Sequence, residues 1–300
     1  NKGSIPNKGS IPNKGSIPNK GSIPAWDGKK DFYNKFGKAE EFILWPKQKN
    51  NNKSCAIYCH YDKDDIVKDY VIQGLKTLIV LRYDIIFCTT SKKIKNVDLP
   101  FKVNYFENTK LRDMKIWTDV LDDGFIKDYD WVLLINDSML FPIHGIDEMR
   151  NIIKEKRSES DFWGLYLSNE GGRLEKNIEH LCSSFIEFNS ASIKKLKEFY
   201  KENIYKCNST EDIIDLIELK QTEFLLENNF KMETVISYKN LKQIENSIMF
   251  NPINTINYII NKECFGIKWK YLGNYLNYGE LDNKYLNYLL RYCKIFKNRM

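Results

Sequence analysis

Two short polar segments follow apolar runs in the first half of this 300-residue sequence. His60 and Asp62 come at the end of the first run, and Asn136 and Asp137 directly follow the second run, residues 131–135. Carboxylates in such places can hold the ribose of a nucleotide and, through a divalent metal, its phosphates. The glycine-rich loops that cradle phosphates in dinucleotide-binding and P-loop proteins are absent from the sequence. A turn-forming or helix-capping aspartate is the alternative interpretation of Asp137.

The periodicity of apolar residues alternates between strand-like and helix-like from residue 25 onward. We expect strands at residues 54–60, 84–90, 101–105, 131–135, 162–167 and 183–189. We expect helices at residues 66–79, with Asp64 as the N-cap, and at residues 113–121, 146–156, 191–200 and 211–228. Repeated βα units predict an α/β fold with a mostly parallel sheet flanked by helices. Such sheets bind ligands beyond the carboxyl ends of their strands, where both polar segments are expected.

Five short motifs follow one another along the chain, and together they resemble one protein family. They are CHYD at Cys59–Asp62, DYV at Asp69–Val71, LINDS at Leu134–Ser138, DFWG at Asp161–Gly164 and HLCSSF at His180–Phe185. In this order and spacing they resemble the rhamnan synthesis F family of glycosyltransferases. The likeness spans about residues 54–270 and includes Asn251-Pro252 and Phe265–Lys268, which are similar to the family's Asn-Pro and Pro-Phe-x-Lys elements.

The resemblance implies a GT-A-like, Rossmann-type α/β sandwich that binds a nucleotide sugar. In that fold a DxD-like motif after a buried strand holds a metal ion and the donor diphosphate. Asn136, Asp137 and Ser138 fill this place here, with Asp137 as the expected ligand of a manganese or magnesium ion. The segment has one carboxylate where DxD has two. A second departure lies before Trp117, where the chain keeps the family's Asp113 but lacks its two glycines.

The resemblance also assigns binding roles to individual side chains. Nucleotide-sugar binding is assigned to His60, Asp62, Asp113, Asn136 and Asp137, and acceptor binding is assigned to Trp163 and His180. The alternatives are a structural histidine at His60 and a core position for the tryptophan, because aromatic side chains are more often found in cores.

Transfer of a sugar requires stabilisation of the leaving diphosphate and removal of the acceptor's hydroxyl proton. Two carboxylates are candidates for the base. Glu223 falls on the amphipathic helix expected at residues 211–228, where many GT-A enzymes place an acidic base, and it is our first choice. Asp161, after the DxD-like strand, is the second choice. The alternatives are a solvated helix position for Glu223 and a strand-start position for Asp161.

Charge and cysteine content bear on partners and location. The net charge of +6 is concentrated at the two ends of the chain, and residues 25–280 carry a small negative balance, so we expect no nucleic-acid partner. Seven scattered cysteines are typical of reduced thiols in a cytosolic protein. The sequence has no apolar run long enough to span a bilayer and no signal-peptide pattern, so we expect a soluble, cytoplasmic protein.

The two ends of the chain differ from its centre. Residues 1–24 are four copies of Asn-Lys-Gly-Ser-Ile-Pro, and a proline in every unit predicts a flexible spacer. Residues 281–300 predict a basic amphipathic helix, because apolar residues recur at helical spacing beside five Lys and Arg residues. The helix either docks on the main domain, residues 25–280, or attaches the protein to the inner face of an anionic membrane.

We therefore predict a hexosyl- or rhamnosyl-transferase (EC 2.4 class). It would move a sugar, expected to be rhamnose, from a nucleotide donor to a surface polysaccharide or a lipid-linked glycan. Two other classes remain open. One is an inactive glycosyltransferase-like subunit that binds or assembles, and the other is an adaptor that acts at a membrane surface or on nucleic acid through its basic ends.

Overall fold

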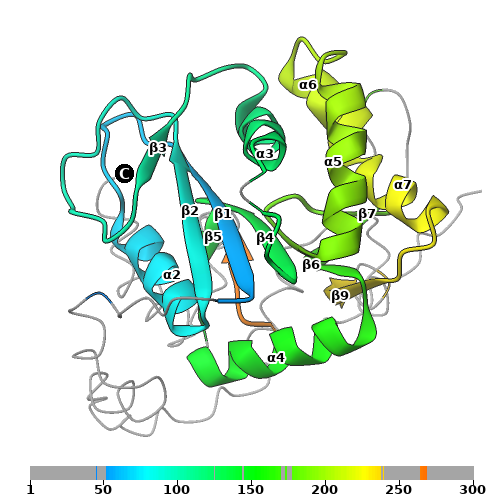
Figure 1. Ribbon diagram of the computed structural model, residues 1–300, viewed down its shortest axis with the longest axis horizontal. Helices are drawn as coiled ribbons and strands as arrows, with labels where there is room; N and C mark the ends of the chain where they lie inside the picture. Colours follow the sequence, from blue (N-terminus) through cyan, green and yellow to red (C-terminus); the bar gives the residue numbers. More distant parts are fainter. Residues whose placement is uncertain are drawn as a thin grey trace, which may run out of the picture.

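The computed structural model describes residues 45, 52–124, 126–143, 145–169, 173, 178–237, 239 and 264–268 (Figure 1). The spacer expected at residues 1–24 and the basic helix expected at residues 281–300 lie outside these residues. Among the helices of the described part, none has both the length and the apolar character needed to cross a bilayer.

The strands of the described part form one large sheet and one small one. They are β1 (Ser54–His60), β2 (Tyr83–Thr89), β3 (Val103–Tyr105), β4 (Trp131–Asn136), β5 (Met139–Leu140), β6 (Phe162–Ser168), β7 (His180–Leu181), β8 (Phe185–Asn189), β9 (Met232–Ser237) and β10 (Ile267–Lys268). The large sheet has the order β3-β2-β1-β4-β8-β6-β7, and β9 pairs with β6. The first four strands are parallel, whereas β8 is antiparallel to both β4 and β6. The predicted α/β class is confirmed, and the sheet is mixed beyond β4.

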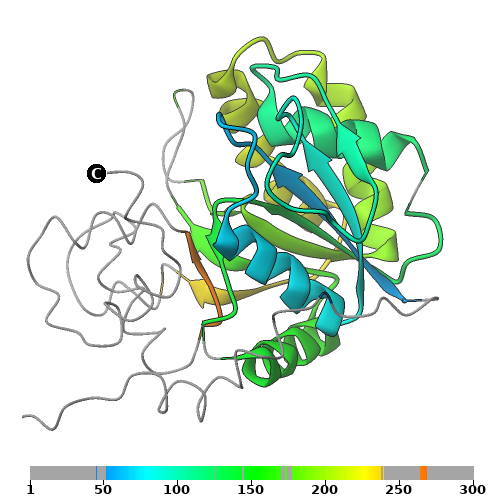
Figure 2. The same cartoon turned by 90° about the vertical axis from the view of Figure 1, so that its left-hand side faces the viewer.

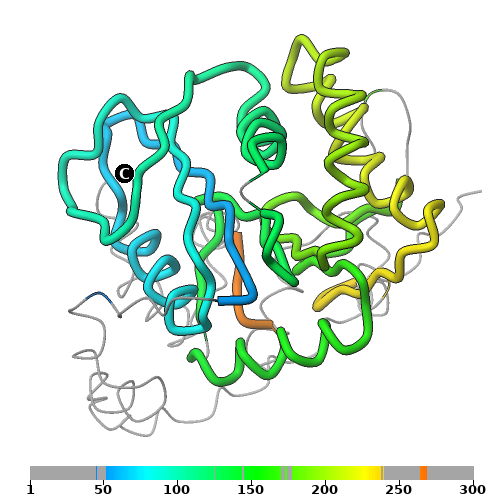
Figure 3. The backbone as a smooth tube through the Cα atoms, in the orientation of Figure 1, coloured from blue at the N-terminus to red at the C-terminus, as the bar shows by residue number. Residues whose placement is uncertain are grey.

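Helices cover both faces of the large sheet, as Figures 1 and 3 show. They are α2 (Asp69–Val80), α3 (Arg112–Asp122), α4 (Ile146–Glu159), α5 (Ser190–Ile204), α6 (Thr210–Ile213), the π-helix η2 (Ile214–Glu218) and α7 (Gln221–Glu227). Helices α2 and α4 contribute to the apolar core on one face, and α3 and α5 contribute to the core on the other. Neighbours along β1 alternate between these cores, with Tyr58 in the first and Ile57 in the second, so the strand is buried on both sides.

Helix α2 begins later than the sequence predicted. It starts at Asp69 after Lys68, not after an Asp64 cap. The backbone N–H of Asp64 donates to the side chain of Asp62 at 2.8 Å, and Asp65 has a φ of 63°. This turn keeps the chain after β1 out of the helical conformation, so its polar residues stay at the carboxyl edge of the sheet.

The single helix predicted at residues 211–228 is instead three consecutive pieces, α6, η2 and α7. In the π-helical turn the hydrogen bonds span five residues instead of four, as in the bond from Leu219 N–H to the Ile214 carbonyl at 3.0 Å. A π-turn changes which residues of the helix face inward, and such turns often occur at functional sites.

Strand β10 lies beside β5 although the two are far apart in the sequence (Figure 2). Lys268 is in register with Met139, just after the segment Asn136–Ser138. The glycine in the Phe265–Lys268 motif allows this approach, because a Cβ on Gly266 would lie 3.3 Å from the carbonyl oxygen of Leu140. The pairing therefore brings the lysine of one motif to the polar end of another.

Candidate active site

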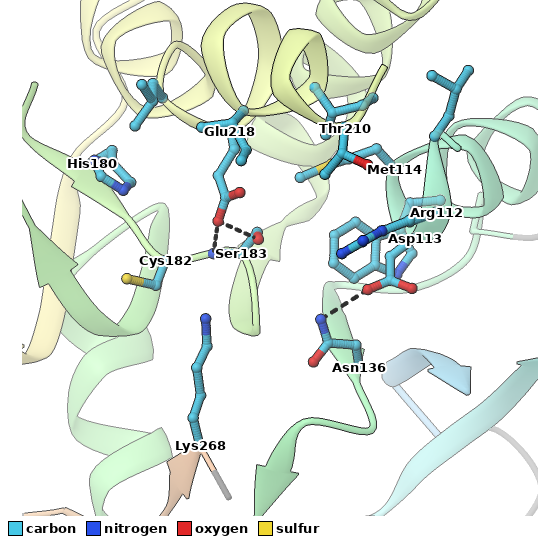
Figure 4. A pocket seen from close by; sticks show the side chains of 15 residues that line it. Arg112, Asp113, Met114, Asn136, His180, Cys182, Ser183, Thr210, Glu218 and Lys268 are labelled. Carbon is cyan, nitrogen blue, oxygen red and sulfur yellow. Dashed lines mark hydrogen bonds between the residues drawn. The ribbon is translucent and has the colours of Figure 1, made fainter. Parts of the chain in front are cut away.

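A cavity of about 440 Å³ lies at the carboxyl end of β4 (Figure 4). Its walls come from β4, β7, β10, the start of α3, the segment before β8, and the helical segment α6–η2. The polar and sulfur-containing side chains that line it are Arg112, Asp113, Met114, Trp117, Asn136, His180, Cys182, Ser183, Thr210, Glu218 and Lys268. Three of the side chains that the sequence assigned to the site are thus brought together, namely Asp113, Asn136 and His180.

Asn136 and Asp113 form a hydrogen-bonded pair on one wall of the cavity. The Asn136 side chain donates from Nδ2 to Asp113 Oδ2 at 2.9 Å, and its own Oδ1 accepts from the backbone N–H and the hydroxyl of Ser138. Burial raises the pKa of the Asp113 carboxyl, although the hydrogen bond from Asn136 and the nearby Arg112 oppose this shift. The remaining oxygen of such a carboxyl can accept a hydrogen bond from a sugar hydroxyl.

Glu218 enters the cavity from the last residue of η2 (Figure 4). The hydroxyl of Ser183 donates to Oε1 of Glu218 at 2.6 Å, and the backbone N–H of Ser183 donates to the same oxygen at 3.4 Å. Oε2 accepts no hydrogen bond from the described part of the chain. A carboxylate fixed at one oxygen and open at the other is suited to remove a proton from a bound hydroxyl.

Two cations line the same cavity. Lys268 extends into it from β10, and Arg112 lies at the first residue of α3 (Figure 4). Arg112 has a φ of 49°, an uncommon conformation for a residue other than glycine and one that tends to occur at functional sites. Neither cation forms an ion pair within 4 Å with any described residue. Both are therefore available to an anionic ligand.

His180 and Trp117 add two ring N–H groups to the cavity wall. His180 is buried, and its Nδ1 lies 2.9 Å from the carbonyl oxygen of Ile178. Since a carbonyl oxygen can only accept, that contact assigns a proton to Nδ1 and leaves Nε2 for a ligand. The indole N–H of Trp117 is buried without a hydrogen-bond partner among the described residues.

His60 and Asp62 do not line this cavity. His60 is buried at the end of β1, where Nδ1 lies 2.9 Å from the hydroxyl of Thr89 and Nε2 lies 3.2 Å from the carbonyl oxygen of Ile66. Burial lowers the pKa of His60 to about 4. Asp62 caps its own turn and pairs with Lys68 at 3.4 Å. In this structure both side chains stabilise the loop that follows β1.

Asp137, the expected metal ligand, also lies outside the cavity lining. Its Oδ2 accepts the backbone N–H of Tyr61 at 2.9 Å, and its carbonyl oxygen accepts the hydroxyl of Tyr70 at 2.8 Å. A magnesium or manganese ion at a nucleotide site is held by one or two carboxylates together with the phosphate oxygens of the ligand, so a carboxylate must face the bound ligand. Within the described residues, no group of three or more His, Cys, Asp or Glu side chains is placed to hold a metal ion. The DxD-like segment therefore does not place its carboxylate in this cavity, where a metal would have to meet the donor diphosphate.

The other three side chains that the sequence assigned to the site do not line this cavity. Glu223 is exposed on α7 and pairs with Lys220 at 3.3 Å, as expected of a solvated helix position. Asp161 accepts hydrogen bonds from the Asn189 side chain and the Lys231 backbone, both at 2.8 Å, which makes it a structural residue before β6. Trp163 has no exposed surface, so its ring is not available to stack on a sugar.

Several lining residues were not assigned from the sequence, and four of them bear charge or hold a charged group, namely Arg112, Ser183, Glu218 and Lys268. Ser183 and Lys268 lie within motifs that carried the resemblance, so those motifs contained the signal. Glu218 gave no such signal, because the π-turn that directs it inward is not visible in an α-helical pattern.

Comparison with known proteins identifies the family. A family model described as rhamnan synthesis protein F matches residues 107–294, which is more than half of the chain. A search of curated proteins gives no match. The matched range contains every residue that lines the cavity. The motifs noted in the sequence and this match agree, and the chain belongs to the rhamnan synthesis protein F family.

Proposed function

We propose that this protein is a glycosyltransferase that moves a sugar, with rhamnose as the expected one, from a nucleotide donor to a glycan acceptor. Membership of the rhamnan synthesis protein F family supports a role in polysaccharide synthesis. The observation that carries the proposal is one cavity in which the carboxylate of Glu218 lies with two cations, Arg112 and Lys268, that form no ion pair with the described residues. A proton acceptor and an anion-binding group are the two elements that this chemistry requires.

The arrangement of the sheet supports a GT-A-like relationship. Four parallel strands in the order β3-β2-β1-β4 are followed by the reversed strand β8, and the DxD-like segment Asn136–Ser138 begins at the last residue of β4. The cavity is at the carboxyl edge of these strands, where open α/β sheets bind their ligands.

The reaction is a substitution at the anomeric carbon of the donor sugar. The acceptor oxygen forms a new bond to that carbon, and the bond between the carbon and the diphosphate oxygen breaks with its electron pair remaining on the diphosphate. The acceptor proton moves to Oε2 of Glu218. Asp113 and His180 line the remaining wall of the cavity, where they can bind hydroxyl groups of the donor sugar or of the acceptor.

The acceptor and the location of the protein are part of the same proposal. A lipid-linked glycan on the cytoplasmic face of a membrane is the acceptor that we favour, with residues 281–300 as the attachment to anionic lipid. Deletion of residues 281–300 should then abolish co-sedimentation with anionic vesicles. Vesicle binding by the shortened chain would contradict membrane attachment through residues 281–300 and would leave the catalytic proposal untouched.

The test of the catalytic proposal is a pair of matched glutamate variants in the full-length protein. Glu218→Gln should lower the turnover of nucleotide-sugar hydrolysis or transfer by at least about a hundredfold, because an amide cannot accept the proton. Glu223→Gln, only five positions away in the same helical segment, should retain wild-type turnover because its side chain is solvent-exposed. Equal turnover by the two variants would refute the role of Glu218. No turnover by the wild-type protein with any donor of a nucleotide-sugar panel would favour a non-catalytic binding subunit.

A further inference from the structure

The two cations of the cavity form no close ion pair with its carboxylates in the described part of the chain. One oxygen of Asp113 accepts from the amide of Asn136, and one oxygen of Glu218 accepts from Ser183, so the hydrogen bonds to each carboxyl come from neutral groups. No ion pair within 4 Å joins Arg112 or Lys268 to either carboxylate in the described part of the chain. Their positive charge remains available to a ligand of the cavity, from a half-buried Lys268 and an exposed Arg112.

The two cations come from separate parts of the fold and are positioned by specific backbone features. Lys268 is placed by the pairing of β10 with β5, and Arg112 is placed by a backbone with positive φ at the start of α3. A residue other than glycine in that conformation is strained, and such strain is concentrated at ligand sites. Guanidinium and ammonium groups that converge on one cavity are typical of phosphate recognition.

The DxD-like carboxylate, Asp137, is not placed beside the two cations. In GT-A-like enzymes that use a metal, acidic side chains hold the ion against the phosphates. Here the Asp137 carboxylate accepts the Tyr61 N–H outside the cavity lining, so it is not positioned to hold an ion against a diphosphate bound in the cavity.

We infer that Arg112 and Lys268 bind the diphosphate of the donor and stabilise it as it leaves, so that this protein transfers its sugar without a divalent metal. This inference rests on the proposed function for the identity of the donor. When the bond from the anomeric carbon to the diphosphate oxygen breaks, the electron pair stays on that oxygen, and the two side chains neutralise the charge in place of a metal ion.

Diphosphate binding can be measured without acceptor and without turnover. Isothermal titration of the full-length protein with UDP, dTDP and GDP would be done once in EDTA and once in manganese. We expect at least one diphosphate to bind in EDTA, with a dissociation constant within about twofold of that in manganese. Binding that appears only with manganese, or no binding by any of the three, would overturn the inference.

Variants of the two cations test which side chains carry the binding. Arg112→Gln and Lys268→Gln should each weaken diphosphate binding about tenfold, because each removes a charged hydrogen bond. Lys268→Arg, which keeps the charge, should restore most of the affinity. Arg82→Gln is a matched control at another arginine with positive φ, and Lys154→Gln is a matched control at an exposed lysine on α4.

Unchanged affinity in both cation variants, with melting temperatures equal to the wild type, would also overturn the inference. The result is separable from the proposed function. Metal-independent diphosphate binding by a protein that shows no transfer would leave the cation site in place and reject the catalytic proposal. Transfer that requires manganese would reject metal-free binding by the two cations and leave the catalytic proposal in place.

Discussion

Ser183 and Glu218 meet through two hydrogen bonds to a single carboxylate oxygen, the hydroxyl donating at 2.6 Å and the backbone N–H at 3.4 Å. The serine precedes β8 and the glutamate ends the π-helix, so the contact joins the sheet to the helical layer above it. It also decides which oxygen of the glutamate faces the cavity. The position of the proposed base therefore depends on a side chain that is not itself expected to touch the proton in transfer.

Replacing Ser183 by alanine should lower kcat about tenfold, because the carboxylate loses its hydroxyl donor and can rotate away from the acceptor. The KM for the donor should change little, since the serine acts on the base and not on the diphosphate. Steady-state kinetics of the full-length protein with saturating acceptor would measure both constants. Ser183→Thr keeps the hydroxyl and should recover most of the activity. A threonine variant as slow as the alanine variant would contradict the positioning role.

Replacing Asp137 by asparagine separates the metal hypothesis from the cation hypothesis. The asparagine side chain retains an oxygen that can accept the Tyr61 N–H, so the loop after β4 should keep its conformation. We expect diphosphate affinity in EDTA within about twofold of the wild type. Asp137→Ala serves as the control for the loop, because it removes the acceptor and should cost about 1 kcal/mol of stability. Loss of diphosphate binding in the asparagine variant, with an unchanged melting temperature, would show that the Asp137 carboxylate takes part in diphosphate binding.

Much of the fold could be predicted from the sequence because its periodicities are clear. The strand predicted at residues 131–135 is β4, and the helix predicted at 146–156 is α4, each within a few residues. The antiparallel direction of β8 relative to β4 and β6 was not predicted. A parallel connection requires a crossover, usually a helix, and residues 169–184 contain no helical pattern, so this segment favoured an antiparallel neighbour.

The site was harder to predict than the fold. Asp113, Asn136 and His180 were found because each lies in or beside a local motif at the carboxyl edge of the sheet. Lys268 depends on the pairing of β10 with β5, and such long-range pairing is not recorded in local periodicity. The inward direction of Glu218 depends on one π-turn. A regular α-helix over the same residues would turn other positions toward the cavity.

A buried ion pair on the opposite side of the sheet from α3 should contribute to the stability of the fold and not to diphosphate binding. Glu187 has no exposed surface and accepts hydrogen bonds from Arg157 at 2.6 and 2.9 Å, from Tyr83 and from Trp163. Arg157→Met should reduce the free energy of unfolding by about 3 to 5 kcal/mol, because it leaves a buried carboxylate without its cation.

Urea denaturation would measure that loss, with Lys154→Met on the exposed face of α4 as the control. The double variant Arg157→Met with Glu187→Met should recover a large part of the loss, since two apolar side chains replace two charges. Diphosphate affinity should be unchanged in every variant that remains folded. A single variant that is as stable as the wild type would contradict the assigned role of the pair.

His60 should make the protein less stable in acid. Its burial lowers its pKa from an ordinary value of 6.5 to about 4, with Asp62 and Lys68 as the nearby charges acting in opposite directions. Between these pH values the unfolded chain binds a proton that the folded chain excludes, so the free energy of unfolding falls as the pH is lowered. The contribution of this one residue should be a loss of about 2 kcal/mol between pH 8 and pH 5.

The measurement is the pH dependence of urea unfolding for the wild type and for His60→Gln. Carboxylates elsewhere in the chain also titrate, but they do so in both proteins, so the difference between the two isolates His60. Glutamine can still donate to the Ile66 carbonyl and accept from the Thr89 hydroxyl, and it carries no titratable group. The stability difference between wild type and variant should therefore shift by about 2 kcal/mol in favour of the variant at pH 5. A difference that stays constant with pH would show that the folded protein accepts a proton at His60 as readily as the unfolded chain does.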